Sequence, residues 1–233
     1  MTKNTTESLA PSIKPKTQRG RRPAIEARYD DKRTEILRVA AELFATRGYE
    51  ATSLDMIASQ IGMHKATLYH YVQGKESILY ECLVKSFENL DTVIEKTSDQ
   101  SVPVKERLVY FVQSLAEAQN NEFGRCLLLV GSRPLEMGPS REIKNFQRKL
   151  DHTVRQLIEE GIRTGVIRPC NPALFSSILF GALNWVPRWY KEDAGLGLKE
   201  IVGAYIDMLL NGVASTPETT PEHVLASERK KAR

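Results

Sequence analysis

The chain has 233 residues, of which 41% are hydrophobic and 27% charged, the balance of a globular protein with an ordinary buried core. No apolar run approaches the length needed to cross a bilayer, and the first residues lack the apolar core of a secretory signal, so we expect a cytoplasmic protein with no membrane partner. The formal net charge is +4. Residues 1–33 hold nine basic and four acidic groups, so an excess of five positive charges lies in this first segment.

We predict that residues 1–29 form a disordered basic arm. Its sequence "RGRRP" places Arg19, Arg21 and Arg22 close together. Arginines on such an arm enter the minor groove of narrow A·T tracts, so these three are candidate DNA contacts. A merely solvated arm is the alternative, and the composition leaves both interpretations open.

Two amphipathic helices follow. The first is predicted from about residue 31 to Gly48, with Ile36, Leu37, Ala40, Leu43 and Phe44 on one stripe. Thr52 and Ser53 are N-cap candidates for a second, short helix over 54–61, which ends at the glycine at position 62.

A third short helix is predicted over "MHKATLYHYV", residues 63–72. Two short helices joined by a glycine turn make a helix-turn-helix, so we assign residues 30–78 to a three-helix DNA-binding domain. The N-terminal end of the third helix would enter the major groove, with these outward-facing residues as candidate contacts: Lys65, Ala66, Thr67, Tyr69 and His70. The inward-facing Tyr71 either packs between helices or contacts DNA.

Helix N-termini also bind phosphate through free N–H groups and the helix dipole. Thr52 or Ser53 stands at one such terminus, and Gly74 and Lys75 stand at another. A lysine at a helix start is disfavoured by the dipole, and a bound phosphate would resolve that conflict.

Residues 79–213 are predicted to form a larger helical domain, and residues 214–233 a disordered tail. A single fourth helix is expected to run from Gly74 to about residue 95 and to contain the junction between the domains. A later long helix, capped by Ser140, is expected to end near Gly161 and Gly165, and Asn171 should cap the helix after it. The fold class is therefore all-α.

The last two helices, over about 172–190 and 198–213, are apolar on more than one face and carry small residues such as Gly181 and Gly203. A helix that is apolar all round must be covered on both sides. Either these are central helices of a bundle, or one face packs on the domain and the other on a second copy. We favour the homodimer, with a C2 four-helix interface.

Residues 31–79, and in particular the stretch "AELFATRGYEATSLDMIASQIGMHKATLYHYVQGKESIL", resemble the DNA-binding domain of the TetR (tetracycline repressor-like) family of transcriptional regulators. The resemblance implies an all-α dimeric repressor that binds a palindromic operator. A small molecule that binds in the C-terminal pocket would release the repressor from this operator. The matching motif carries over these DNA contacts: Thr52, Lys65, Thr67, Tyr69, His70, Tyr71 and Lys75. Met63 and His64 stand where the family more often has valine and serine, so His64 either caps the recognition helix or reaches a phosphate.

The stretch "LFGALNWVPRWY", residues 179–190, is similar to that of family members that respond to acyl-CoA or to related lipid and steroid intermediates. Asn184 is an amide on an apolar helix, and Pro187 is expected to kink that helix. The candidate effector-binding residues are Phe111, Leu115, Phe123, Cys126, Leu127, Val130, Leu150, Val154, Phe180, Asn184 and Trp185. An ordinary role in the core or in an interface stays open for each of them.

Catalysis and cofactors find no support in the sequence. Cys82, Cys126 and Cys170 are predicted to be buried, reduced thiols, and the four histidines have no metal-ligand spacing. We find no nucleophile with a base, no carboxylate pair and no phosphate-binding glycine loop, so we expect neither an enzyme, nor a metal, nor a cofactor. The alternative to a ligand-responsive regulator is a constitutive DNA-binding protein without an effector.

Overall fold

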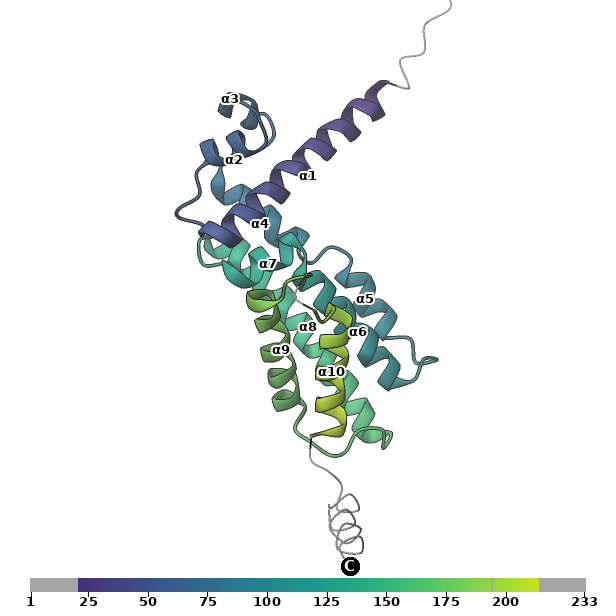
Figure 1. The fold of residues 1–233 in the computed structure, drawn as a ribbon. Coiled ribbons are helices and arrows are strands. Elements are labelled where there is room, and N and C mark those ends of the chain that lie inside the picture. The colour runs from purple at the N-terminus through teal and green to yellow at the C-terminus, as the bar shows by residue number, and fades with distance from the viewer. Residues whose placement is uncertain (1–20, 194, 214–233) are drawn as a thin grey trace, which may run out of the picture.

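The computed structural model describes residues 21–193 and 195–213, and the part of the chain that it describes contains only helices and the turns between them (Figure 1). The all-α prediction is confirmed. The helices are α1 (Arg21–Arg47), α2 (Leu54–Gln60), α3 (Lys65–Leu68), α4 (Lys75–Lys85), α5 (Leu90–Thr97), α6 (Val104–Asn120), α7 (Glu122–Leu129), α8 (Met137–Arg163), α9 (Pro172–Trp189) and α10 (Leu198–Asn211).

The first helix is longer than predicted. We assigned residues 21–29 to a disordered arm, but they form the N-terminal part of α1. Two features account for the difference: Pro23 is tolerated in the first helical turn, and a tertiary contact holds the segment. The Tyr29 ring stacks on Tyr71 with centroids 4.8 Å apart, and its hydroxyl donates to the His70 carbonyl oxygen at 2.9 Å. Arg19 and the tail at 214–233 lie outside the described residues.

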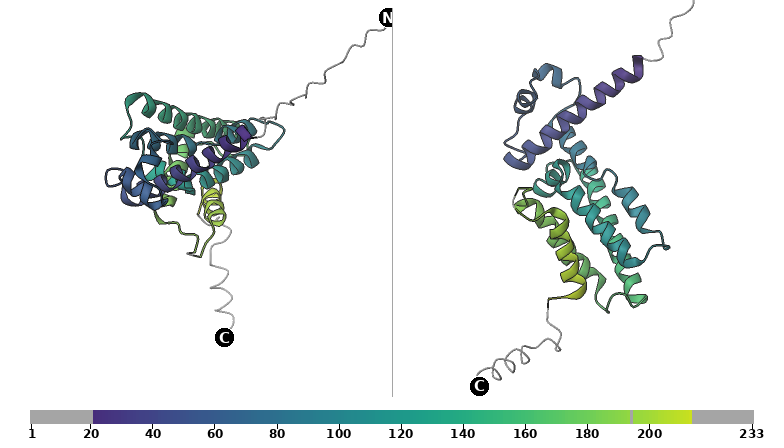
Figure 2. Two further views of the ribbon diagram at one scale, coloured as in Figure 1. Left: turned by 90° about the horizontal axis from the view of Figure 1, so that it is seen from above. Right: turned by 45° about the vertical axis from the view of Figure 1, so that its right-hand side comes forward.

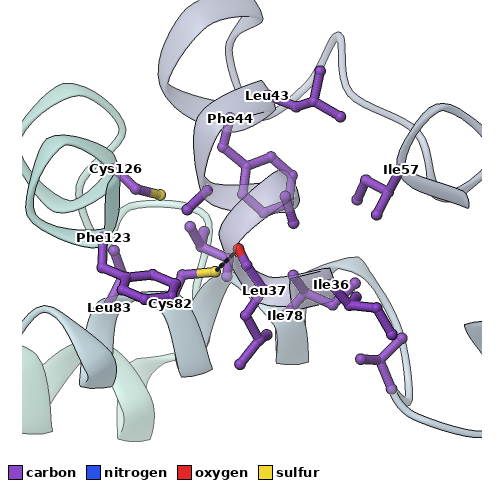
Figure 3. Close-up of a cluster of buried hydrophobic side chains, with 14 of the residues drawn as sticks. Ile36, Leu37, Leu43, Phe44, Ile57, Ile78, Cys82, Leu83, Phe123 and Cys126 are labelled. Atoms are coloured by element: carbon purple, nitrogen blue, oxygen red, sulfur yellow. Dashed lines mark hydrogen bonds between the residues drawn. The ribbon is translucent and has the colours of Figure 1, made fainter. Parts of the chain in front are cut away.

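The small N-terminal unit has its own core, formed by α1 to α4. Ile36, Phe44, Ile57 and Leu68 bring one buried side chain or more from each of α1, α2 and α3 into it. In Figure 3 the thiol of Cys82 on α4 donates to the Leu37 carbonyl oxygen at 3.3 Å, which joins α4 to α1. The amphipathic stripes read from the sequence therefore meet in one cluster.

The fourth helix is broken, where we predicted one continuous helix. After α4 the backbone amides of Phe87 and Glu88 bond to carbonyls three residues back, and Asn89 takes a left-handed conformation with φ 69° before α5 begins. Asparagine tolerates this conformation better than most residues. The apolar spacing continues across the break, which is why periodicity alone predicted an unbroken helix.

The larger C-terminal unit is a bundle of α5, α6, α8, α9 and α10 around a second core (Figures 1 and 2). The buried residues of the first cluster reach Leu83 on α4 and those of the second start at Leu90. Core membership therefore divides the chain a few residues beyond the predicted boundary at 78/79. Arg107 fastens the α5–α6 loop, because its guanidinium donates to the carbonyls of Thr97 and Val102 and pairs with Glu160.

Helix α7 belongs to the C-terminal unit in sequence but packs on the N-terminal unit. Phe123, Cys126 and Leu127 join the first core cluster, and Glu122 pairs with Arg38 of α1. Gly124 permits the close approach of α6 to α7, since a Cβ at this position would lie 2.0 Å from the Ala118 carbonyl oxygen. The two units are thus joined by packed side chains as well as by the chain itself.

Helix α8 starts at Met137, three residues before the predicted cap. Ser140 lies inside its first turn and its hydroxyl donates to Ser132 Oγ at 3.2 Å, so the Ser140 cap was wrong. The predicted cap of α9 is confirmed, because the Asn171 side chain accepts from the backbone amides of Ala173 and Leu174. Helix α9 continues through Pro187 to Trp189.

Candidate nucleic-acid interface and effector cavity

The turn between α2 and α3 exposes one face of the recognition helix. Ser53 caps α2 by accepting from the Met56 amide at 3.2 Å, and Gly62 makes the turn with φ 67°. Leu68 is fully buried, which anchors α3 on the core. The predicted outward-facing side chains are all exposed: Lys65, Ala66, Thr67, Tyr69 and His70. They lie within one helical turn and its continuation, as a groove-reading surface requires.

Lys65 has an acidic neighbour in this free protein. Its ammonium pairs with Asp55 on α2 at 2.8 Å, and this hydrogen bond raises the pKa of Lys65. Both side chains are exposed, so the pair is open to exchange with another anion. A phosphate is such an anion.

The recognition helix is shorter than predicted and has no side-chain cap. His64 occupies the N-cap position with an exposed side chain, but it makes no capping hydrogen bond. Of the two roles that we considered, capping is therefore wrong. After Leu68 the amides of His70 and Tyr71 bond to carbonyls three residues earlier, as in a 3₁₀ turn. The regular α-helix therefore covers Lys65–Leu68 and not residues 63–72 as predicted.

Thr52 belongs to the core rather than to the surface. Its side chain is 1% exposed, and its hydroxyl donates to the carbonyls of Gly48 at 2.9 Å and Leu43 at 3.3 Å. A hydroxyl held in this way fixes the α1–α2 turn and does not reach solvent. The prediction that Thr52 contacts DNA is therefore not supported by its position.

Tyr71 serves as a packing residue. Its half-buried ring lies against Tyr29, and its carbonyl accepts from Arg33 Nε at 3.3 Å. These contacts tie the end of the recognition helix to α1. Arg21 and Arg22 form the start of α1 itself, which Figure 1 shows projecting beyond the small unit.

A cavity of about 380 Å³ lies between α6, α7, α8 and α9, with the end of α4 and the start of α5 at its wall. Five predicted residues line it: Leu115, Leu127, Leu150, Phe180 and Asn184. The sequence reasoning missed these: Ser86, Phe87, Leu90, Ala118, Gln119, Gly124, Leu128, Gln147, Asp151 and Ser177.

Six predicted effector-binding residues lie elsewhere. Phe111 and Val154 are fully buried in the second core cluster, and Phe123, Cys126 and Val130 pack in or against the first. Trp185 is 60% exposed on the outside of α9. A hydrophobic residue on an amphipathic helix fits core, cavity or interface equally well, so the pattern did not separate these roles.

The polar groups of the cavity centre on one amide pair. Gln119 Nε2 donates to Asn184 Oδ1 at 2.8 Å, while the buried Gln119 Oε1 has no hydrogen-bond partner among the described residues. Asp151 accepts from the Ser176 hydroxyl and from Arg155 at 2.8 Å. A lone amide on the buried stripe of α6, four residues after Leu115, was the sequence signal that would have found Gln119.

Two of the three thiols are buried as predicted. Desolvation raises the pKa of Cys82 well above its ordinary value and that of Cys126 to about 12. The prediction that Cys170 is buried was wrong, because it lies exposed in the loop between α8 and α9. No group of three or more potential metal ligands comes together among the residues that the structure describes.

The sequence matches two family descriptions that together span most of this architecture. Residues 36–82 match "Bacterial regulatory proteins, tetR family", and residues 101–213 match "Tetracyclin repressor-like, C-terminal domain". The structure also resembles the TetR family regulator PfmR from Thermus thermophilus, with 31% identity over 77% of this chain and 99% of PfmR and a TM-score of 0.70. The chain belongs to the TetR family of transcriptional regulators.

Two further regulators are similar to this chain over most of its length. AibR, solved with isovaleryl coenzyme A and operator DNA, shares 25% identity over 76% of this chain and 97% of AibR, with a TM-score of 0.68. The transcriptional repressor KstR2 of Mycolicibacterium smegmatis is 24% identical over 79% of this chain and 92% of its own length.

TetR proteins are DNA-binding regulators and not enzymes, so the non-enzyme prediction is confirmed. The helix-turn-helix described above is the family's N-terminal part, and the cavity lies in the part that matches its C-terminal domain. Among the described helices, none has the length and apolar character to span a bilayer.

Proposed function

We propose that the chain is a repressor that binds a palindromic operator as a homodimer and is released by a small hydrophobic or acyl-CoA-type effector. The observation that carries this proposal is the pairing of an exposed recognition face on α3 with a cavity whose wall includes the end of α4. Helix α4 thus runs from Lys75, a proposed phosphate contact, to its C-cap Ser86 at the cavity wall. Its action on DNA implies a place in the cytoplasm.

The proposed DNA contacts form three groups, which contact base edges in the major groove, phosphates, and the minor groove. Thr67 and Lys65 reach base edges or adjacent phosphates, with His70 beside them, and Ala66 lies where it meets a thymine methyl group. Tyr69, His64, Ser53 and Lys75 are placed for phosphates. Arg21 and Arg22, together with Arg19, extend the contact toward the minor groove. Thr52 and Tyr71 support this surface from behind.

The proposed dimer uses the outer faces of α9 and α10. These helices lie side by side on the outside of the bundle (Figure 1), and α9 exposes a row of large apolar side chains: Leu174, Ile178, Trp185 and Trp189. Met208 on α10 adds to it, next to the exposed Gly203 and Ala204. Monomeric proteins rarely leave so contiguous an apolar patch in water. A second copy related by a two-fold axis covers it and sets two recognition helices about 34 Å apart.

The proposed effector has an apolar body, because five leucines, two phenylalanines and one alanine supply eight of the fifteen residues that line the cavity. The likeness to AibR, which was solved with isovaleryl coenzyme A, supports a coenzyme A thioester. Binding at Ser86 and Phe87 would displace the C-terminal end of α4, and with it the N-terminal end that carries Lys75. The operator affinity then falls by a factor that is set by the ratio of the effector's affinities for the displaced and the undisplaced state.

A direct test joins the two activities in one assay. The protein is titrated onto DNA fragments from the flanks of its own gene, followed by fluorescence anisotropy and footprinting, with and without acyl-CoA, steroid and aromatic compounds. We expect one protected palindrome and a compound that both raises the melting temperature and weakens the complex. A compound that binds the protein but leaves operator affinity unchanged would contradict effector-controlled release and favour a constitutive DNA-binding protein.

A further inference from the structure

We propose that the part of the effector inside the cavity is uncharged and donates a hydrogen bond to Gln119 Oε1. This inference rests on the proposed function, because it assigns the cavity to an effector. It names the chemistry that the effector must bring: an apolar body with one hydroxyl or amide N–H, and no buried carboxylate.

The charge of the cavity excludes an anion from its interior. Asp151 contributes a carboxylate, and none of the described lining residues is a lysine, arginine or histidine. Arg155 pairs with Asp151 but is not part of the wall. A free fatty acid would lose the hydration of its carboxylate and find a second carboxylate in place of a cation, which is unfavourable.

The hydroxyl protons of the wall are already used. Ser86 donates to the Leu83 carbonyl at 2.6 Å and Ser177 to the Ala173 carbonyl at 2.8 Å. The Ser176 hydroxyl behind the wall donates to Asp151. What these hydroxyl groups still offer to a ligand is therefore oxygen lone pairs, which suit a hydrogen-bond donor on the ligand.

The acceptor for such a donor is the side-chain oxygen of Gln119. Its side chain is held by the hydrogen bond from Nε2 to Asn184 Oδ1, and the residue is 8% exposed. Its Oε1 is buried and accepts no hydrogen bond from any residue in the described ranges, although Gln119 lines the cavity. A buried acceptor of this kind discriminates strongly between a ligand that satisfies it and one that does not.

Two sources supply the required donor. A hydroxylated lipid or sterol brings an O–H on the apolar body, and a coenzyme A thioester brings the amide N–H groups of its pantetheine arm while its phosphates stay outside. Both keep charge out of the cavity. The same acyl chain as a free acid does not.

The experiment uses four probes of one chain length on the full-length protein at pH 7.5: 1-decanol, decyl methyl ether, decanoate and decanoyl-CoA. Binding is measured by isothermal titration calorimetry on the wild type, on Gln119→Met, and on Gln113→Met as a control on the same helix outside the cavity. The ether differs from the alcohol chiefly by the missing donor, so this pair tests the hydrogen bond even without a variant.

We expect 1-decanol to bind about five- to tenfold more tightly than decyl methyl ether, the size of one net hydrogen bond, and decanoate to bind most weakly. Gln119→Met should either abolish the preference for decanol over the ether or weaken the binding of decanoyl-CoA, and the probe that is affected identifies the donor. The control Gln113→Met should leave the binding of both probes unchanged. Equal binding of alcohol and ether together with unchanged binding of decanoyl-CoA in Gln119→Met, or tighter binding of decanoate, overturns the inference while leaving the proposed function intact. If no probe or other compound binds, both fail.

Discussion

Lys75 and Tyr49 are joined by two contacts between the start of α4 and the α1–α2 turn. The Lys75 ammonium donates to the Tyr49 carbonyl oxygen at 2.8 Å and lies 4.1 Å from the centroid of the Tyr49 ring. The carboxylate of Glu50 is also near, with its Oε2 4.0 Å from the Lys75 nitrogen. The lysine therefore gives the Tyr49 carbonyl, which lies beyond the end of α1, a hydrogen-bond donor. It also places a positive charge beside the N-terminus of α4.

This arrangement predicts a double effect of Lys75→Ala. We expect weaker binding to all DNA sequences alike, with a salt slope lower by about one charge per subunit, because a phosphate contact carries no base information. We also expect a loss of stability of about 1 kcal/mol from the hydrogen bond and the cation–π contact. Salt-dependent anisotropy and urea unfolding measure the two. A loss confined to one operator sequence would assign Lys75 to base readout instead.

Thr67→Ala should change base preference. The exposed hydroxyl and methyl group of Thr67 lie on the groove face of α3, where a lost base contact alters discrimination by about 1–3 kcal/mol. Affinities for a set of operators with single base-pair changes measure this effect. Thr92→Ala, on the exposed side of α5, is the matched control and should leave the preferences unchanged. If both variants rank the operators as the wild type does, Thr67 is only a packing residue.

Ile178→Glu should produce monomers. The side chain is 59% exposed in the middle of the apolar row on α9, and a carboxylate there would be buried without a partner in the dimer. Sedimentation at micromolar concentration should show a halved mass, with a large loss of operator affinity because each half-site then binds alone. Val166→Glu introduces the same charge at another exposed apolar residue, in the loop after α8, and should remain dimeric.

Tyr80→Phe should lower stability in a pH-dependent way. The Tyr80 hydroxyl donates to Glu142 Oε2 at 2.6 Å, joining α4 to α8, and this hydrogen bond raises the pKa of Tyr80 above its ordinary value of 10.0. A raised pKa means that the contribution is complete below pH 10 and is lost as the pH rises through the folded-state pKa. We expect a difference of about 0.5–1 kcal/mol between wild type and variant at pH 8 that shrinks above pH 10. Urea unfolding measures it, and Tyr110→Phe on α6 is the control; a constant difference would mean that the hydroxyl stabilises in another way.

The thiols should differ sharply in reactivity. A thiolate is the reacting species, and burial keeps Cys82 and Cys126 protonated, whereas Cys170 is exposed. Ellman's reagent at pH 8 should therefore label one thiol per chain quickly in the native protein and three after unfolding. Cys170→Ser should remove the fast reaction. Fast labelling of two or more thiols in the native wild type would show that the core around α4 and α7 opens readily.

Local patterns were sufficient to predict that the chain is helical and which residues of α3 are exposed, although not where every helix begins and ends. Ile36, Phe44, Ile57 and Leu68 recur at helical spacing because burial on one side of a helix imposes that period, and the same pattern placed Lys65 and Thr67 on the opposite face. The Asn171 cap was also readable, because its hydrogen bonds stay within three residues. These features depend on near neighbours in the chain.

Other features depend on contacts between distant residues, and only the tertiary structure decided them. Tyr29 packs on Tyr71 and so extends α1 into the predicted arm. Gln119 and Asn184 are 65 residues apart in the sequence, and they meet at the cavity only because α6 and α9 pack together. Periodicity shows that a side chain is turned inward. It does not show whether protein or empty space lies opposite, because that is fixed by the packing of whole helices.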